Sequence, residues 1–167
     1  MRLLPLISVA LLLATATANA HVSLDVGEAA VGKSYKAVLK VGHGCAGEAT
    51  TAIRVRLPSE LSAARPQPKA GWTLAVKNGD AHAAGSHHHA APVQEISWSG
   101  GPLLDGWYDE FVFVAAIPAD AKPGPVYLPV VQQCGDAAAR WIELPGASGE
   151  EPGEPAPVLT LVPASKP

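Results

Sequence analysis

The sequence lacks several features that would assign a function directly. No apolar run beyond residue 13 approaches the 18 residues of a membrane-spanning helix. Positive charge is not in excess, since 12 lysines and arginines stand against 15 aspartates and glutamates, which argues against a nucleic-acid partner. Catalytic motifs are missing as well: there is no Gly-x-Ser-x-Gly elbow, no His-Glu-x-x-His pair and no phosphate-binding loop. From these absences we expect no enzyme, no nucleic-acid partner and no stable membrane insertion.

The one long apolar run belongs to an N-terminal stretch, residues 1–20, that is typical of a secretory signal. Arg2 supplies its positive region, and Ala18-Asn19-Ala20 supplies the small-residue cleavage site. Cleavage after residue 20 of the 167 would leave 147 residues, enough for one domain with a sizeable core. We therefore expect a periplasmic or secreted protein whose domain spans residues 21–163.

Short segments of alternating polar and apolar residues dominate the mature chain. Their period of two, their β-branched and aromatic residues and the Gly and Pro between them indicate strands. With 16 prolines and 16 glycines, little room is left for helices. The expected strands cover residues 22–26, 35–41, 51–57, 72–76, 96–98, 110–115, 126–132, 141–144 and 158–162. They predict an all-β fold, an antiparallel β-sandwich of immunoglobulin or fibronectin type, with a Gly/Glu/Pro-rich linker at 145–157.

His21 would become the mature N-terminus, and an N-terminal histidine offers two nitrogens from one residue. Its free α-amine and its ring Nδ1 can close a chelate ring on a single metal ion. Free α-amines lose their proton at roughly pH 8 and imidazoles at about 6.5, so both groups can bind metal near neutral pH. Nitrogen donors of this kind suit Cu(II). The alternative is that a histidine follows the cleavage site by chance.

Only two cysteines, Cys45 and Cys134, are present. An even count behind a secretory signal indicates one disulfide in an oxidising compartment. Such a bond would close most of the mature domain into a loop, which is worth about 4–5 kcal/mol on the chain-entropy model. The alternative is a pair of thiolates, which are good ligands for Cu(I).

Two further histidine groups are candidate ligands. A His-rich tract, formed by His82 and His87-His88-His89, is of a composition that binds divalent metals, although concentrated imidazoles bind copper or nickel without a defined function. His43 lies between two glycines, two residues before Cys45. It is either the second histidine of a copper-binding brace or a turn residue beside the disulfide.

Acidic and aromatic side chains add to the candidates. Asp109 and Glu110 stand at the mouth of an expected strand, and alternation puts Asp109 on the face of an inward Phe111, where it would need a partner. Ile142 and Leu144 favour an inward face, so that Trp141 is expected to point outward. An outward tryptophan is either an edge residue or a cap over a metal site.

Several segments spread over nearly the whole mature chain match one known family. They are Ala-His-Val at 20–22, Tyr-Lys-Ala-Val-Leu-Lys-Val at 35–41, His-Gly-Cys at 43–45, Ala-Thr-Thr-Ala-Ile-Arg-Val at 49–55, Pro-Gln-Pro-Lys-Ala-Gly-Trp-Thr-Leu at 66–74, Trp-Ser-Gly-Gly at 98–101, Tyr-Asp-Glu-Phe at 108–111, Pro-Val-Val-Gln-Gln-Cys at 129–134 and Trp-Ile-Glu at 141–143. In these segments the chain resembles the YcnI-like family of secreted copper-binding proteins.

The resemblance implies a β-sandwich that binds Cu(II) through its N-terminal histidine, with a carboxylate ligand and a nearby tryptophan. His21 and Trp141 match the histidine and the tryptophan. The carboxylate does not transfer, because Tyr35 stands where family members have a glutamate early in the second strand. Substitute ligands are Asp109, Glu110, Glu48, Glu143 or His43.

The sequence therefore predicts a Cu(II)-binding protein that acts in copper trafficking or homeostasis and exchanges copper with other envelope copper proteins. Two rival functions remain. A histidine brace also serves copper monooxygenases that attack polysaccharides, in which a second histidine completes the site, and His43 is the candidate outside the His-rich tract. A sandwich that binds only a partner, without metal, is the third possibility.

Overall fold

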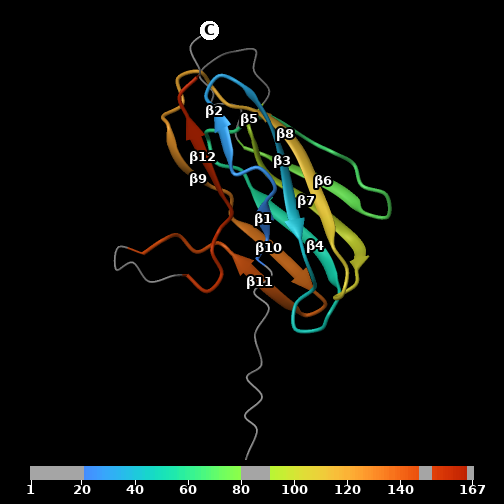
Figure 1. The fold of residues 1–167 in the computed structure, drawn as a ribbon. Coiled ribbons are helices and arrows are strands. Elements are labelled where there is room, and N and C mark those ends of the chain that lie inside the picture. The colour runs from blue at the N-terminus through green and yellow to red at the C-terminus, as the bar shows by residue number, and fades with distance from the viewer. Residues whose placement is uncertain (1–20, 80–90, 147–151, 165–167) are drawn as a thin grey trace, which may run out of the picture.

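The computed structural model describes residues 21–79, 91–146 and 152–164 (Figure 1). The predicted secretory signal and the His-rich tract lie outside these residues. The described chain forms twelve strands and no helix. The strands are β1 Ser23–Leu24, β2 Glu28–Ala30, β3 Ser34–Val41, β4 Thr50–Arg56, β5 Ser62–Pro66, β6 Thr73–Asn78, β7 Val93–Leu103, β8 Asp109–Ala116, β9 Gly124–Tyr127, β10 Val130–Cys134, β11 Ala137–Trp141 and β12 Val158–Val162.

Two larger sheets form the two layers of the sandwich. One has the order β1-β3-β8-β5 and the other the order β11-β10-β4-β7-β6, and all neighbours within them are antiparallel. A small sheet, β2-β12-β9, contains the parallel pair β2–β12 and lies at the end opposite the start of the described chain (Figure 1). The expected antiparallel β-sandwich is confirmed.

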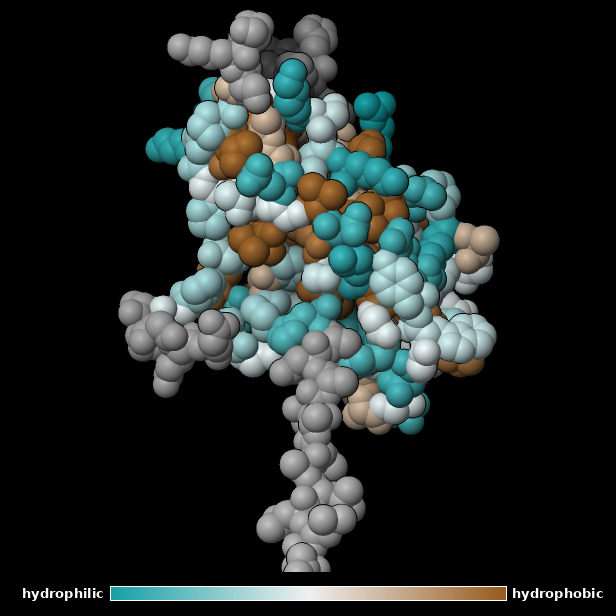
Figure 2. Space-filling model, viewed as in Figure 1, coloured by the Kyte–Doolittle hydropathy of each residue, from teal (hydrophilic) through white to brown (hydrophobic). Residues whose placement is uncertain are grey.

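The core forms between the two layers because alternate residues of each strand point inward. In β3, Tyr35, Ala37, Leu39 and Val41 are all buried, as their alternation predicts. At the centre, Phe111 of β8 packs edge-on against Trp98 of β7 and Trp72, and joins the two sheets. On the outer side of the four-stranded sheet, apolar residues form separate patches between hydrophilic ones (Figure 2).

The segment 126–132 is not one strand, as predicted, but parts of two. Pro129 separates β9 from β10 and has no N–H to donate to a sheet. β9 pairs with β12 in the small sheet, whereas β10 pairs with β4 and β11 in the five-stranded sheet. The short strands β2 and β5 were not predicted, because their residues show no apolar alternation.

The predicted disulfide joins Cys45, which follows β3, to Cys134 at the end of β10, with their Cα atoms 5.7 Å apart. Neither sulfur is a free thiol, so the thiolate alternative does not hold here. The bond ties the two sheets together at the end where residue 21 lies. Within the described ranges, no helix has the length and apolar character that a membrane crossing requires.

Candidate metal site

His21 lies at one end of the sandwich. It lies two residues before Ser23, the first residue of β1, which is opposite Lys40 near the end of β3. The chain enters the sandwich beside β10 and β11 (Figure 1). The His21 ring lies against the indole of Trp141, with ring centroids 5.3 Å apart and planes tilted by 58°. The structure thus brings together the two residues that the resemblance assigns to a copper site.

The prediction that Trp141 points outward is wrong. Trp141 is only 7% exposed, whereas Ile142 and Leu144 are 42% and 57% exposed. The register of the β10–β11 hairpin decides this, because it sets Trp141 opposite Val130, which is fully buried. The predicted strand 141–144 is also wrong, because β11 is Ala137–Trp141 and Ile142 and Leu144 follow its end. Their alternation therefore does not determine the face of Trp141.

Gln132 of β10 fixes the indole in place. Its side chain is 1% exposed, and its Oε1 accepts a hydrogen bond from Trp141 Nε1–H at 3.1 Å. Its Nε2 donates to the carbonyl oxygen of His43 at 2.7 Å and to Thr50 Oγ1 at 2.8 Å. A buried amide with both its oxygen and its nitrogen engaged holds all three partners in fixed positions.

Sequence reasoning did not single out Gln132. A pattern that could have found it is present, because Gln132 alternates with Val130 and Cys134 and so occupies an inward position of β10. A polar side chain at an inward position needs partners. Its partners come from β4, β11 and the segment after β3, and no single-strand pattern identifies such distant residues.

The network continues from Gln132 to the disulfide. Thr50 is fully buried, and its Oγ1 lies 3.8 Å from Cys134 Sγ. On the far side of the bond, Cys45 Sγ lies 3.9 Å from the carbonyl oxygen of Gln132. The indole that contacts His21 is therefore held by a buried hydrogen-bond network that adjoins the Cys45–Cys134 disulfide.

His43 joins this network through its main chain. Its carbonyl oxygen accepts from Gln132, and its ring Nδ1 forms a hydrogen bond with the carbonyl oxygen of Gly44. Gly44 allows the close turn, because a Cβ there would stand 1.9 Å from the carbonyl oxygen of Glu48. The structure places His43 at the same end as Trp141, as a turn residue beside the disulfide.

The carboxylate candidates have partners of their own. Asp109 is half-buried and pairs with Lys69 at 2.6 Å, which supplies the partner that its predicted inward position requires. Glu110 accepts from the Tyr108 hydroxyl at 2.6 Å, and chiefly this bond raises the pKa of Tyr108 to about 12. Glu143 accepts from a backbone N–H, and Glu48 is exposed in the turn that begins at Cys45.

No group of three or more His, Cys, Asp or Glu side chains that could hold a metal ion occurs within the described residues. His82 and His87–His89 lie outside them.

Tyr35, which the resemblance to the YcnI-like family sets against a glutamate, is remote from His21. It stands at the start of β3, whereas His21 lies beside the end of that strand. The Tyr35 hydroxyl donates to the carbonyl oxygen of Val26 at 2.5 Å. Burial, with a smaller contribution from Asp25, raises the pKa of Tyr35 to about 12. Tyr35 is a core residue here.

Comparisons with known proteins agree with this architecture. A family model described as a domain of unknown function, DUF1775, matches residues 21–161. A crystal structure of an uncharacterized protein from Nocardia farcinica, described as revealing an immunoglobulin-like fold, is similar with a TM-score of 0.69 and 30% sequence identity. The match covers 84% of this chain and 97% of that one. No curated protein matches the chain.

Proposed function

We propose, from the premise that this chain belongs to the DUF1775 family, that it is a periplasmic Cu(II)-binding protein acting in copper trafficking or homeostasis. The observation that carries the proposal is the contact between His21 and Trp141, with ring centroids 5.3 Å apart. In this contact, His21, which a secretory cleavage would make the N-terminal residue, lies against Trp141, whose indole N–H is bonded to the buried side chain of Gln132. YcnI-like domains carry the same family model, which supports the assignment.

The chemistry rests on the processed N-terminus. Once residues 1–20 are removed, the α-amine and Nδ1 of His21 bind Cu(II) as one chelate. The indole Nε1–H of Trp141 is a donor only and is already bonded to Gln132, so the tryptophan does not act as an ordinary ligand. Its apolar ring lies against the His21 imidazole and would limit the access of water to an ion held there.

Two nitrogens from one residue leave other positions of the ion open. Water, one of the candidate carboxylates or a donor from another envelope copper protein would complete the coordination. Such an open arrangement suits a protein that receives copper and passes it on, and we assign it no catalytic reaction. A polysaccharide monooxygenase would need a second imidazole on the metal, for which His43 is the candidate.

The test is a Cu(II) titration of protein that begins at His21, followed by electron spin resonance. We expect one tight site with nitrogen hyperfine structure. The matched control retains Ala20, which converts the α-amine into an amide while leaving every described residue in place. This control should lose most of the Cu(II) affinity.

Equal affinity in the two proteins would overturn the proposal. Thermal unfolding of both proteins without copper should coincide, which excludes a folding defect in the extended form. Peroxide-driven oxidation of chitin or cellulose by the loaded protein would instead decide for the monooxygenase.

A further inference from the structure

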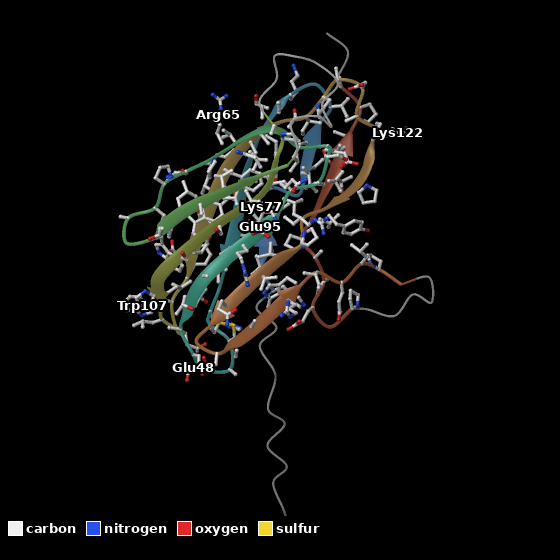
Figure 3. The ribbon with its side chains drawn as sticks, turned by 180° about the vertical axis from the view of Figure 1, so that it is seen from behind. Glu48, Arg65, Lys77, Glu95, Trp107 and Lys122 are labelled. Carbon is white, nitrogen blue, oxygen red and sulfur yellow. A yellow bond between two sulfur atoms is a disulfide. The ribbon has the colours of Figure 1, made fainter. Side chains whose placement is uncertain are left out.

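Three arginines stand on the outer face of the five-stranded sheet. Arg54 and Arg56 belong to β4 and Arg140 to β11, and all three are exposed. Arg54 and Arg140 flank Val131 of β10 in one row across the sheet. In the next row, Arg56 is opposite Glu95 of β7. Figure 3 looks onto this face, with Glu95 and Lys77 near its middle.

None of these three guanidinium groups forms an ion pair within the described part of the chain, although Glu95 faces Arg56 across the strands. The two ion pairs found there are Lys40–Asp25 and Lys69–Asp109, and neither includes an arginine. Glu154, the carboxylate that meets Arg140, accepts from its backbone N–H. A protein with a net charge of −3 thus carries three arginines on one open face, where Glu95 is the carboxylate among the residues that line their cavity.

The face is hollowed as well as charged. The three arginines line a cavity of about 490 Å³ together with Glu95, Pro129, Val131 and Ile142. A second cavity of about 360 Å³ shares Arg56 and Pro129 with the first. Its other lining residues are mostly apolar and include Tyr127 and Leu144, with Glu60 as the one carboxylate. We call the two together the arginine trough. Exposed apolar side chains of its wall, Ile142 and Leu144, adjoin its cations.

We infer that the arginine trough is a docking surface for an acidic, extended segment of a partner protein. Neighbouring strands are about 4.8 Å apart, so the backbones at Arg54 and Arg140 stand about 10 Å from each other. Cations spread over this distance fit several carboxylates along a chain better than one small anion. Guanidinium groups suit carboxylates because they donate two parallel hydrogen bonds. The second, more apolar cavity of the trough accommodates apolar side chains that lie between the acidic residues of the bound segment.

This inference does not rest on copper binding. Arg140 immediately precedes Trp141, but the two side chains lie on opposite faces of β11. The trough is therefore on the outside of the same two strands that carry Gln132 and Trp141 inside. Its test uses no metal, so its outcome is separate from that of the proposed function.

The test uses fluorescence anisotropy with a dye-labelled synthetic peptide in which glutamates are interspersed with leucines. The matched peptide has glutamine at every glutamate. The double variant Arg54→Gln/Arg140→Gln removes two cations from the trough, and Arg65→Gln removes one from β5, away from it (Figure 3). All three side chains are exposed, and coincident thermal unfolding confirms that each variant folds.

We expect the acidic peptide to bind the native chain and Arg65→Gln alike, and to bind the double variant about tenfold more weakly or worse. Binding should also weaken as salt is raised. The inference is overturned if the acidic peptide does not bind, if the glutamine peptide binds equally well or if the double variant binds like the native chain. It is also overturned if inorganic phosphate displaces the peptide at concentrations near the peptide's own Kd, because the trough would then be a small-anion site.

Discussion

Two buried tryptophans of this sandwich use their indole groups differently. Trp98 is fully buried at the centre of the core, packs against Phe111, and donates its Nε1–H to the backbone carbonyl oxygen of Gln67 at 3.0 Å. Trp141 is 7% exposed at the end of the sandwich and donates instead to the side chain of Gln132. One of its neighbours is the imidazole of His21.

The acceptor of each indole N–H distinguishes a tryptophan that is buried for the stability of the fold from one that is held in place for a site. A backbone carbonyl needs no special residue, so the bond of Trp98 only satisfies a buried donor. The bond of Trp141 requires a particular buried side chain that is itself held by two further hydrogen bonds. A site whose orientation matters benefits from such supporting contacts.

The largest expected effect concerns Trp98. Trp98→Ala should lower the free energy of unfolding by about 3–5 kcal/mol, because it removes a large side chain between the two sheets. Urea denaturation measures this loss. Trp107→Ala, at a position 61% exposed, is the control and should change stability by less than about 0.5 kcal/mol.

If Trp98→Ala does not fold, Trp98→Phe keeps the domain testable, since it retains an aromatic ring in the core. Copper affinity of the folded protein should equal that of the native chain in either variant. A clear loss of copper affinity in folded Trp98→Phe would erase the distinction between the two tryptophans.

The next effect concerns the support of Trp141. Gln132→Leu deprives the Trp141 indole N–H and the His43 carbonyl of their partner, and should cost about 1–3 kcal/mol of stability. It should also alter the spin-resonance spectrum of bound Cu(II), which a purely structural role would leave unchanged. Gln94→Leu, on an exposed position of β7, is the control. An unchanged spectrum in Gln132→Leu would show that the amide serves only the fold.

A smaller effect appears only at alkaline pH. The folded chain raises the pKa of Tyr35 from 10.0 to about 12, chiefly through burial. The unfolded chain therefore loses this proton first, so Tyr35 costs no stability below pH 10 and lowers it by about 1.4 kcal/mol per pH unit as the pH rises from 10 toward 12.

Tyr35→Phe should remove this part of the alkaline loss in urea titrations at successive pH values. Tyr108→Phe should leave most of it in place, because solvent screens the exposed Tyr108–Glu110 bond. The contrary result is an equal loss of unfolding free energy with rising pH in Tyr35→Phe and Tyr108→Phe. The buried hydroxyl of Tyr35 would then not cause the alkaline loss, and Tyr35 could not be grouped with Trp98 as a residue that serves only the core.

The fold follows from the sequence in most of its strands, and its errors have physical causes. Alternation identified β3, β4, β8 and β12 because each buries one face of a regular strand. It assigned Trp141 to the wrong face because it placed the strand at 141–144, whereas β11 ends at Trp141 and pairs Trp141 with Val130. Such a pairing is a contact between strands and leaves no mark in either strand alone.

The candidate site was predicted less completely than the fold. The N-terminal position of His21 and the resemblance pointed to His21 and Trp141, which the structure brings together. Gln132 was missed, since its role depends on partners distant in sequence. Asp109 was expected to need a partner, but nothing in the chain order identifies Lys69 as that partner.

The most direct test of the central claim is copper-dependent quenching of tryptophan fluorescence in Trp141→Phe and Trp98→Phe. Paramagnetic Cu(II) bound at His21 should quench the indole that lies against that ring. We predict that Trp141→Phe loses most of the quenching and still binds copper with modestly changed affinity, whereas Trp98→Phe retains the quenching. Equal quenching in native protein and Trp141→Phe would show that the indole is far from the metal and would contradict the account.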